Sequence, residues 1–105
     1  MKLRSFNIDN KESMIRLGGI NVLDSRDLAL TVADTFKEIT TTQSINYIFK
    51  GSFDKANRSS INSYRGPGID EGLKILEEIS NTFEIPVITD IHEPQQAKVV
   101  SEICE

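Results

Sequence analysis

YIFKGSFDKANRSSINSYRGPG, residues 47–68, is the most informative stretch of this chain. It begins as an apolar β-type run, 47–49, and passes without a turn residue into a polar loop. We therefore predict a strand that leads into an anion-binding loop. Within an otherwise acidic chain, this loop sets four cations against one acid, namely Lys50, Lys55, Arg58 and Arg65 against Asp54.

The residue types of this loop suit small, highly oxygenated anions. Arg binds phosphate or carboxylate through two parallel hydrogen bonds, and Lys adds a compact, mobile charge. Lys50 and Ser52 are two residues apart, so in a strand their side chains share the face opposite Phe49. The alternative interpretation is a solvated loop with incidental charges. It is disfavoured because Lys50 directly follows the apolar run, and because nearly hydrophobe-free loops of about 15 residues are more often functional or disordered than idle.

The segments on either side alternate between strand and helix patterns. An apolar run at 15–22, with a Gly pair indicating close backbone approach or a bend, precedes an amphipathic helix of about fifteen residues. Asp24 or Ser25 is its predicted N-cap. The repeated order of strand and helix predicts parallel strands with right-handed crossovers. The other predicted elements are a hairpin of 2–8 and 14–17 around IDNKE, strands at 46–53 and 86–92, and helices from Asp70 to Phe83 and from Pro94 onward.

Apolar spacing also predicts the buried side of each helix. Cys104 is expected to be a small residue on the face of the third helix. The predicted apolar stripes are Leu28, Val32, Phe36 and Ile39, with Ala29 and Ala33 beside them, in the first helix, Leu73, Leu76, Ile79 or Ser80 and Phe83 in the second, and Ala97, Val100 and Ile103 in the third.

Polar side chains follow each of the three predicted strands. Asn21 ends the first strand, Lys50 and Ser52 the second, and Asp90 and His92 the third. Ligands of parallel α/β folds bind beyond the carboxyl ends of the strands, so we expect these groups to converge into a site. Asn21 has the alternative interpretation of a turn or cap residue. His92 either has a structural role, capping the third helix or bonding Asp90, or belongs to the ligand pocket.

Length and composition limit the possible functions. The 105 residues allow one domain, 1–105, and 38% of them are hydrophobic. No apolar run is long enough to cross a bilayer and the amino end has no signal-type apolar region, so a cytoplasmic protein is expected. The single Cys and single His make a structural zinc site unexpected. A net charge of −4 gives no support to nucleic-acid binding.

The three strand–helix units fit either an open doubly wound sheet or part of a (β/α)₈ barrel, and the dinucleotide-binding glycine pattern is absent. A full barrel needs about 250 residues. The expected fold is therefore α/β, the amino-terminal part of a TIM barrel with an amino-terminal β-hairpin, of which the chain supplies the first three βα units.

FKGSFDKANRSSINSYRGPG, followed by ITDIHEP at 88–94, closely resembles the 3-deoxy-D-manno-octulosonate 8-phosphate synthases. That resemblance implies a cytoplasmic transferase of lipopolysaccharide biosynthesis, usually a homotetramer. Its members condense phosphoenolpyruvate with arabinose 5-phosphate, and water addition and C–O cleavage release phosphate without a Schiff base. By motif, the resemblance assigns Lys50, Ser52 and Lys55 to phosphoenolpyruvate, Asn57, Arg58 and Ser59 to arabinose 5-phosphate, and catalytic positions to Asn21, Lys55 and Asp90.

Asn21 also bears on the metal requirement that the resemblance implies. Metal-dependent members have Cys at this position of GGINVLDSRD, and an amide is a weak ligand for such metals. The resemblance therefore implies the metal-independent subclass, with no cofactor. The other hypotheses are the related synthase that uses erythrose 4-phosphate, whose members typically carry a KPRTSPYSFQG-like segment in place of ANRSS, and a non-catalytic remnant that binds phosphorylated sugars. The 105-residue chain alone is expected to be inactive.

Overall fold

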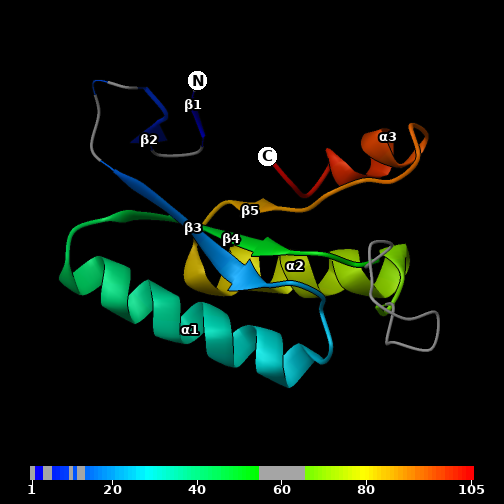
Figure 1. Ribbon diagram of the computed structural model, residues 1–105, viewed down its shortest axis with the longest axis horizontal. Helices are drawn as coiled ribbons and strands as arrows, with labels where there is room; N and C mark the ends of the chain where they lie inside the picture. Colours follow the sequence, from blue (N-terminus) through cyan, green and yellow to red (C-terminus); the bar gives the residue numbers. More distant parts are fainter. Residues whose placement is uncertain (1, 4–5, 10, 12–13, 55–65) are drawn as a thin grey trace.

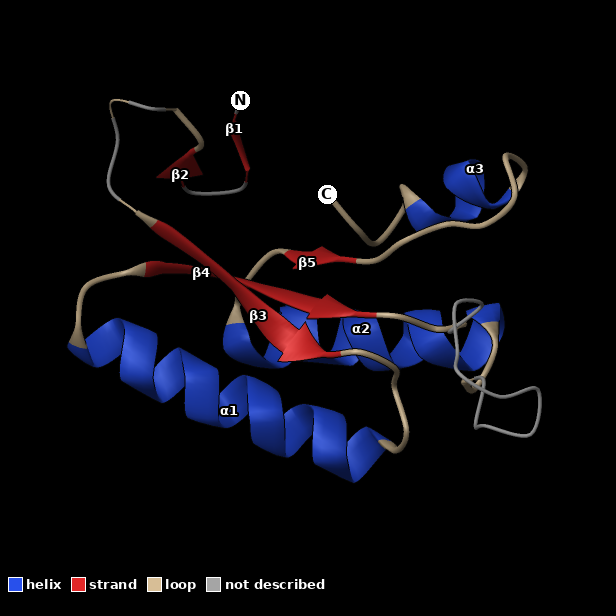
Figure 2. Cartoon of the chain, in the orientation of Figure 1, coloured by secondary structure: helices blue, strands red, loops and turns tan. Residues whose placement is uncertain are grey.

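The computed structural model describes residues 2–3, 6–9, 11, 14–54 and 66–105 (Figure 1). Its centre is a parallel three-stranded sheet of order β3-β4-β5, in which α1 connects β3 to β4 and α2 connects β4 to β5 (Figure 2). The predicted alternation of parallel strands and helices is therefore confirmed. The elements are β1 (Lys2–Leu3), β2 (Phe6–Asn7), β3 (Ile15–Ile20), α1 (Arg26–Thr42), β4 (Asn46–Gly51), α2 (Ile69–Phe83), β5 (Val87–Ile88) and α3 (Gln96–Val100).

The strands are shorter than the apolar runs that predicted them. β3 ends at Ile20 rather than residue 22, β4 at Gly51 rather than residue 53, and β5 covers only Val87–Ile88. Beyond the ladder, the Leu23 amide donates to the Ser52 carbonyl at 2.9 Å, so the two chains stay linked outside regular pairing. The apolar runs continue past the strand ends because Leu23 and Phe53 are themselves buried in the core.

The predicted amino-terminal hairpin paired the wrong two segments. β1 pairs with β2 in an antiparallel arrangement, with Leu3 opposite Phe6. Of the second predicted hairpin strand, 14–17, residues 15–17 instead belong to β3, which pairs in parallel with β4 over six residues. They therefore form part of the central sheet, and no pairing between β2 and β3 occurs among the described residues.

Helix α1 begins as predicted, because the Ser25 hydroxyl accepts a hydrogen bond from the Leu28 amide at 3.1 Å. The buried face of α1 is centred on Ala29 and Ala33, which the prediction placed beside the apolar stripe, whereas Leu28 of the stripe itself is 43% exposed. Small side chains face the sheet because they let the helix approach it closely. Of the rest of the predicted stripe, Val32 and Phe36 are half-buried and Ile39 is exposed. Thr40, outside the stripe, is buried and donates its hydroxyl to the Phe36 carbonyl.

The N-cap of helix α2 lies two residues before the predicted cap, Asp70. Gly68 is the N-cap, with a φ of 89°, a conformation that residues with a Cβ rarely adopt. The Gly68 amide also donates to the Phe53 carbonyl at 3.1 Å, which ties the start of α2 to the chain that leaves β4. The predicted buried stripe of α2 is confirmed for Leu73, Leu76, Ile79 and Ser80, and Phe83 is half-buried.

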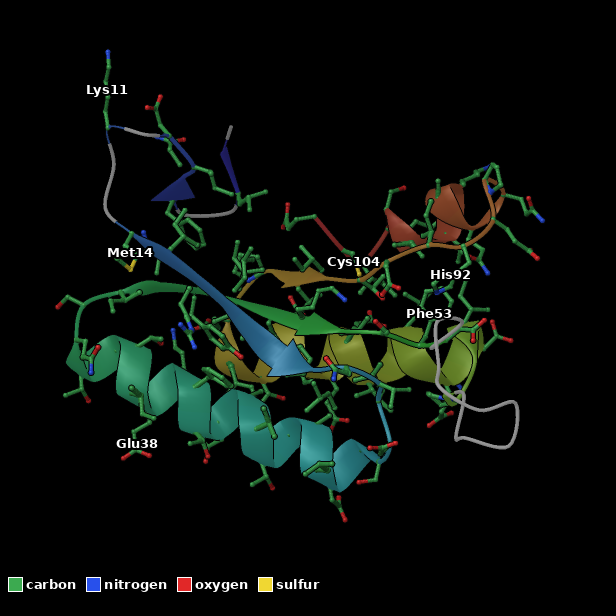
Figure 3. All side chains as sticks on the ribbon, viewed as in Figure 1. Lys11, Met14, Glu38, Phe53, His92 and Cys104 are labelled. Atoms are coloured by element: carbon green, nitrogen blue, oxygen red, sulfur yellow. The ribbon has the colours of Figure 1, made fainter. Side chains whose placement is uncertain are left out.

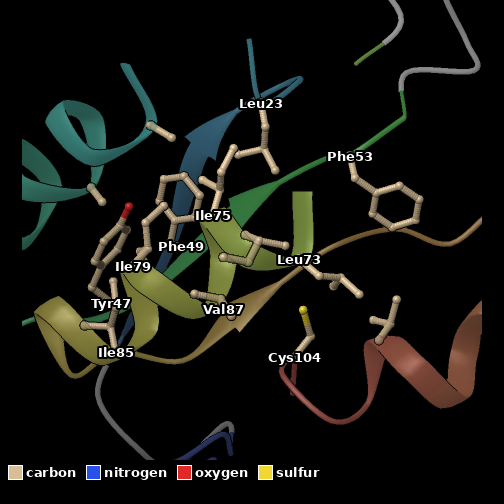
Figure 4. Close-up of a cluster of buried hydrophobic side chains, with 14 residues drawn as sticks. Leu23, Tyr47, Phe49, Phe53, Leu73, Ile75, Ile79, Ile85, Val87 and Cys104 are labelled. Carbon is tan, nitrogen blue, oxygen red and sulfur yellow. The ribbon is translucent and has the colours of Figure 1, made fainter. Parts of the chain in front are cut away.

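Helices α1 and α2 cover one face of the sheet, and the main core lies between them and the strands (Figure 4). Tyr47, Phe49 and Phe53 project from the β4 segment into this core. Val100 of α3 is buried as predicted, but Ala97 is exposed and Ile103 half-buried. Cys104 follows α3 rather than lying on its face, and burial raises the pKa of its thiol to about 11. No helix among the described residues is long and apolar enough to span a membrane.

Candidate functional site

The candidate site lies on the sheet face opposite α1 and α2. Because strand side chains alternate, the pattern that directs Phe49 into the core directs Lys50 and Ser52 to this other face. Lys50 Nζ lies 3.1 Å from Ser52 Oγ and 3.2 Å from Asp90 Oδ1. Ser52 also donates its hydroxyl to Asp90 Oδ1. The structure therefore brings together three polar residues predicted from two different strands.

The charge state of Asp90 follows from these contacts. Partial burial opposes ionisation, but the hydrogen bonds from Ser52 and Lys50 outweigh it and hold the pKa of Asp90 below its ordinary value of 3.8. Asp90 is thus a carboxylate that fixes the Lys50 ammonium at the sheet edge. The Lys50 side chain is still 41% exposed, so its remaining donors face open space.

A cavity of about 550 Å³ opens over this face. Asn21 lies in its lining, so the first strand contributes to the same site as the second. Gly19 allows the strands to approach here, since a Cβ on it would lie 1.9 Å from the Lys50 carbonyl oxygen. The lining residues are Leu17, Gly18, Gly19, Ile20, Asn21, Lys50, Ser52 and Ile88. A cationic and hydroxyl-bearing wall beside apolar groups suits a small anionic metabolite.

His92 joins the same cluster from the segment after β5. Its Nε2 lies 2.6 Å from the Asp54 carbonyl oxygen and 3.3 Å from Asp90 Oδ2. The ring packs edge-on against Phe53, with centroids 6.3 Å apart, and Figure 3 places both side chains at the same end of the molecule. The Asp54 carbonyl is the member of this cluster that the sequence did not predict. No side-chain pattern could have found it, because it is a main-chain atom.

Four of the predicted site residues, Lys55, Asn57, Arg58 and Ser59, lie outside the described residues. Of the residues on either side of this segment, Phe53 and Gly68 are joined by the hydrogen bond from the Gly68 amide to the Phe53 carbonyl. Across 2–3, 6–9, 11, 14–54 and 66–105, no group of three His, Cys, Asp or Glu side chains is placed to hold a metal ion.

Comparison with known proteins gives consistent matches. A family model described as the DAHP synthetase I family matches residues 5–105. The chain is 59% identical over its whole length to a protein of Pseudoalteromonas translucida and 58% identical to one of Hahella chejuensis. A relative in Pseudomonas savastanoi is 53% identical. All three are named 2-dehydro-3-deoxyphosphooctonate aldolase, and the chain spans 37% of the length of each.

Proposed function

Because this chain belongs to the DAHP synthetase I family, we propose that its protein condenses phosphoenolpyruvate with D-arabinose 5-phosphate. The products are 3-deoxy-D-manno-octulosonate 8-phosphate and inorganic phosphate, a step of lipopolysaccharide biosynthesis. The observation that carries this proposal is the Lys50–Ser52–Asp90 cluster over the open cavity. The names of the similar proteins, which refer to the octulosonate product, also support it.

The proposed reaction brings two anionic substrates together, so it needs cations that offset their repulsion. Phosphoenolpyruvate C3 attacks the aldehyde carbon of the sugar, and the aldehyde oxygen takes up a proton to become a hydroxyl. Water adds at C2, and the C2–O bond to phosphate breaks, so phosphate leaves with the bridging oxygen. Lys50, held by Asp90, supplies charge for the carboxylate or phosphate of phosphoenolpyruvate, and Ser52 supplies a hydrogen bond.

The remaining roles come from the matching motif. Lys55 would share phosphoenolpyruvate with Lys50, and Asn57, Arg58 and Ser59 would hold arabinose 5-phosphate. Asn21 lines the cavity at the position where metal-dependent members carry Cys, which supports a metal-independent mechanism.

The fold and assembly of the protein belong to the same proposal. The parallel βα order supports the first three units of a (β/α)₈ barrel within one domain, 1–105. We further propose a cytoplasmic location, since both substrates are phosphorylated metabolites that do not cross membranes unaided, and a homotetramer, the assembly that the resemblance implies. Light scattering would measure the mass of the assembly, and a monomer mass would refute the tetramer.

Phosphate release by the complete gene product tests the reaction. We expect release with phosphoenolpyruvate and arabinose 5-phosphate together and none with either alone. Bridging ¹⁸O in phosphoenolpyruvate should appear in the released phosphate, because the C–O bond breaks. Release with erythrose 4-phosphate in place of arabinose 5-phosphate would indicate the related synthase. Calorimetric binding of both substrates without turnover would indicate a non-catalytic protein.

A pair of lysine variants tests the site itself. Lys50→Met removes the cation at the sheet edge, whereas Lys74→Met removes an exposed cation on α2. We expect the first to lower kcat/KM by at least about 100-fold, as loss of a charge-assisted contact to an anion can cost about 3 kcal/mol. The second should leave kcat/KM unchanged. Equal effects of the two substitutions would refute the proposed role of Lys50.

A further inference from the structure

The Asp90 carboxylate lies where the main-chain pairing of the sheet has already ended. β4 and β5 pair at only two positions, Phe49 opposite Val87 and Lys50 opposite Ile88. Asp90 follows two residues after the last of these pairs, outside the ladder. The position of its carboxylate relative to Lys50 therefore depends on contacts of its side chain.

The two oxygens of the Asp90 carboxylate have different partners. Oδ1 lies 3.2 Å from Lys50 Nζ and accepts a hydrogen bond from the Ser52 hydroxyl. Oδ2 lies 3.3 Å from His92 Nε2. Rotation about the bond to an Asp carboxylate is soft, so contacts to one oxygen leave the plane of the group free to turn. The contact at Oδ2 fixes that plane, and with it the direction from which Oδ1 meets the Lys50 ammonium.

His92 is a fixed hydrogen-bond donor in this arrangement. Its Nε2 also lies 2.6 Å from the Asp54 carbonyl oxygen, and a carbonyl oxygen only accepts, so Nε2 carries a proton that faces both acceptors. The His92 ring packs edge-on against the buried Phe53 (Figure 3), and its backbone amide donates to Gln96 Oε1 at 2.9 Å. The core and the start of α3 thus hold the donor in place beside Asp90.

We propose that His92 is a positioning residue, which holds the Asp90 carboxylate through the Nε2 proton so that Asp90 directs the Lys50 ammonium into the cavity. This inference rests on the proposed function. The cavity lining described above does not include His92, so His92 acts through Asp90 and not on a substrate. The role needs a donor at this reach rather than an imidazole as such, and it has no object once the carboxylate is removed.

A double-mutant cycle in the complete gene product tests whether His92 acts through Asp90. His92→Met removes the donor, and Asp90→Ala removes the group that the donor holds. We expect His92→Met alone to lower kcat/KM for phosphate release about tenfold, the fold-change that one lost hydrogen bond produces. In the Asp90→Ala background the same substitution should change kcat/KM less than about twofold, because no carboxylate is left to position.

Two further variants serve as controls. His92→Gln keeps an N–H at similar reach, so its kcat/KM should stay within about threefold of the wild-type value. Gln95→Ala removes an exposed contact to the neighbouring Glu93 and should leave kcat/KM unchanged in both backgrounds. Thermal unfolding of each variant shows whether it folds.

The other outcomes separate the explanations. An undiminished effect of His92→Met in the Asp90→Ala background would show that His92 acts elsewhere, for example through the Asp54 carbonyl, and would overturn the proposal. Equal activities of the Gln and Met variants would overturn it as well. A Met variant that does not fold would show a structural role and also overturn it. An inactive wild type would instead refute the proposed function.

Discussion

The Asp90→Asn substitution removes one charge from the candidate site while keeping the shape of the side chain. Asp90 Oδ1 lies 3.2 Å from Lys50 Nζ, and the two side chains are 42% and 41% exposed. Ion pairs with this much exposure contribute about 0.2–1 kcal/mol to folding. The variant should therefore lose less than about 1 kcal/mol in its free energy of unfolding, measured by denaturant titration.

The effect of Asp90→Asn on activity should be larger than its effect on stability. Without the carboxylate, Ser52 remains as the partner among the described residues that directs the Lys50 ammonium toward the cavity. Hydrogen bonds of charged groups are worth about 1.5–3 kcal/mol, which corresponds to a loss of about 10- to 150-fold in kcat/KM. Phosphate release by the complete gene product measures this loss. Full activity in the variant, or a stability loss larger than the loss of transition-state binding, would refute the assigned role.

Acid titration gives a second readout of the same variant. The folded-state pKa of Asp90 is lowered, so its contribution to stability is present above the ordinary value of 3.8 and is lost as pH falls through the lowered value. Wild type should therefore lose this increment below about pH 4, whereas the Asn variant has no such increment to lose. Parallel unfolding curves of the two proteins across that range would contradict the ionised Asp90.

Two further substitutions test the framework beneath the site. Gly19→Ala would place a Cβ 1.9 Å from the Lys50 carbonyl, so it should destabilise the protein by about 3 kcal/mol or more; Gly18→Ala meets only a side-chain ring, and an equal loss of thermal midpoint there would contradict the argument. Arg26→Met removes the contact from Nε to Glu78 Oε2 at 2.7 Å, which joins α1 to α2, so the melting temperature should fall. The fall should shrink in about 1 M salt, which screens exposed charges, and a salt-independent fall would indicate lost packing instead.

The order of strands and helices was predictable because it depends on residues that are close together in the sequence. The Ser25 cap, the apolar runs and the paired glycines each depend on residues within a few positions of one another. Parallel pairing then followed from the alternation of strands with helices, since a helical crossover returns the chain in the same direction. The boundaries were less predictable, because Ser52 and Phe53 remain buried after β4 has left the ladder.

The face of α1 shows where local periodicity is insufficient. Leu28 and Ile39 have the spacing of a buried stripe, but the helix is turned so that Ala29 and Ala33 meet the sheet. Several overlapping stripes of α1 are apolar, and the choice among them depends on how closely the sheet can be approached. Gly18, against which Phe36 packs, sets that distance, and its effect on α1 is a contact between segments far apart in the sequence.

The directions of the Lys50 and Ser52 side chains were easier to predict than the buried face of α1, because the alternation along β4 determines both the core side and the opposite side of the strand. Side chains alternate between the two faces of β4, so Tyr47 and Phe49 point into the core beneath the helices. Lys50 and Ser52 therefore point to the opposite face, where the cavity lies. A shift of register by one residue would bury the ammonium in the core and expose the aromatic rings, which would cost far more than the site contributes. Selection for a stable core at Phe49 thus holds Lys50 over the cavity.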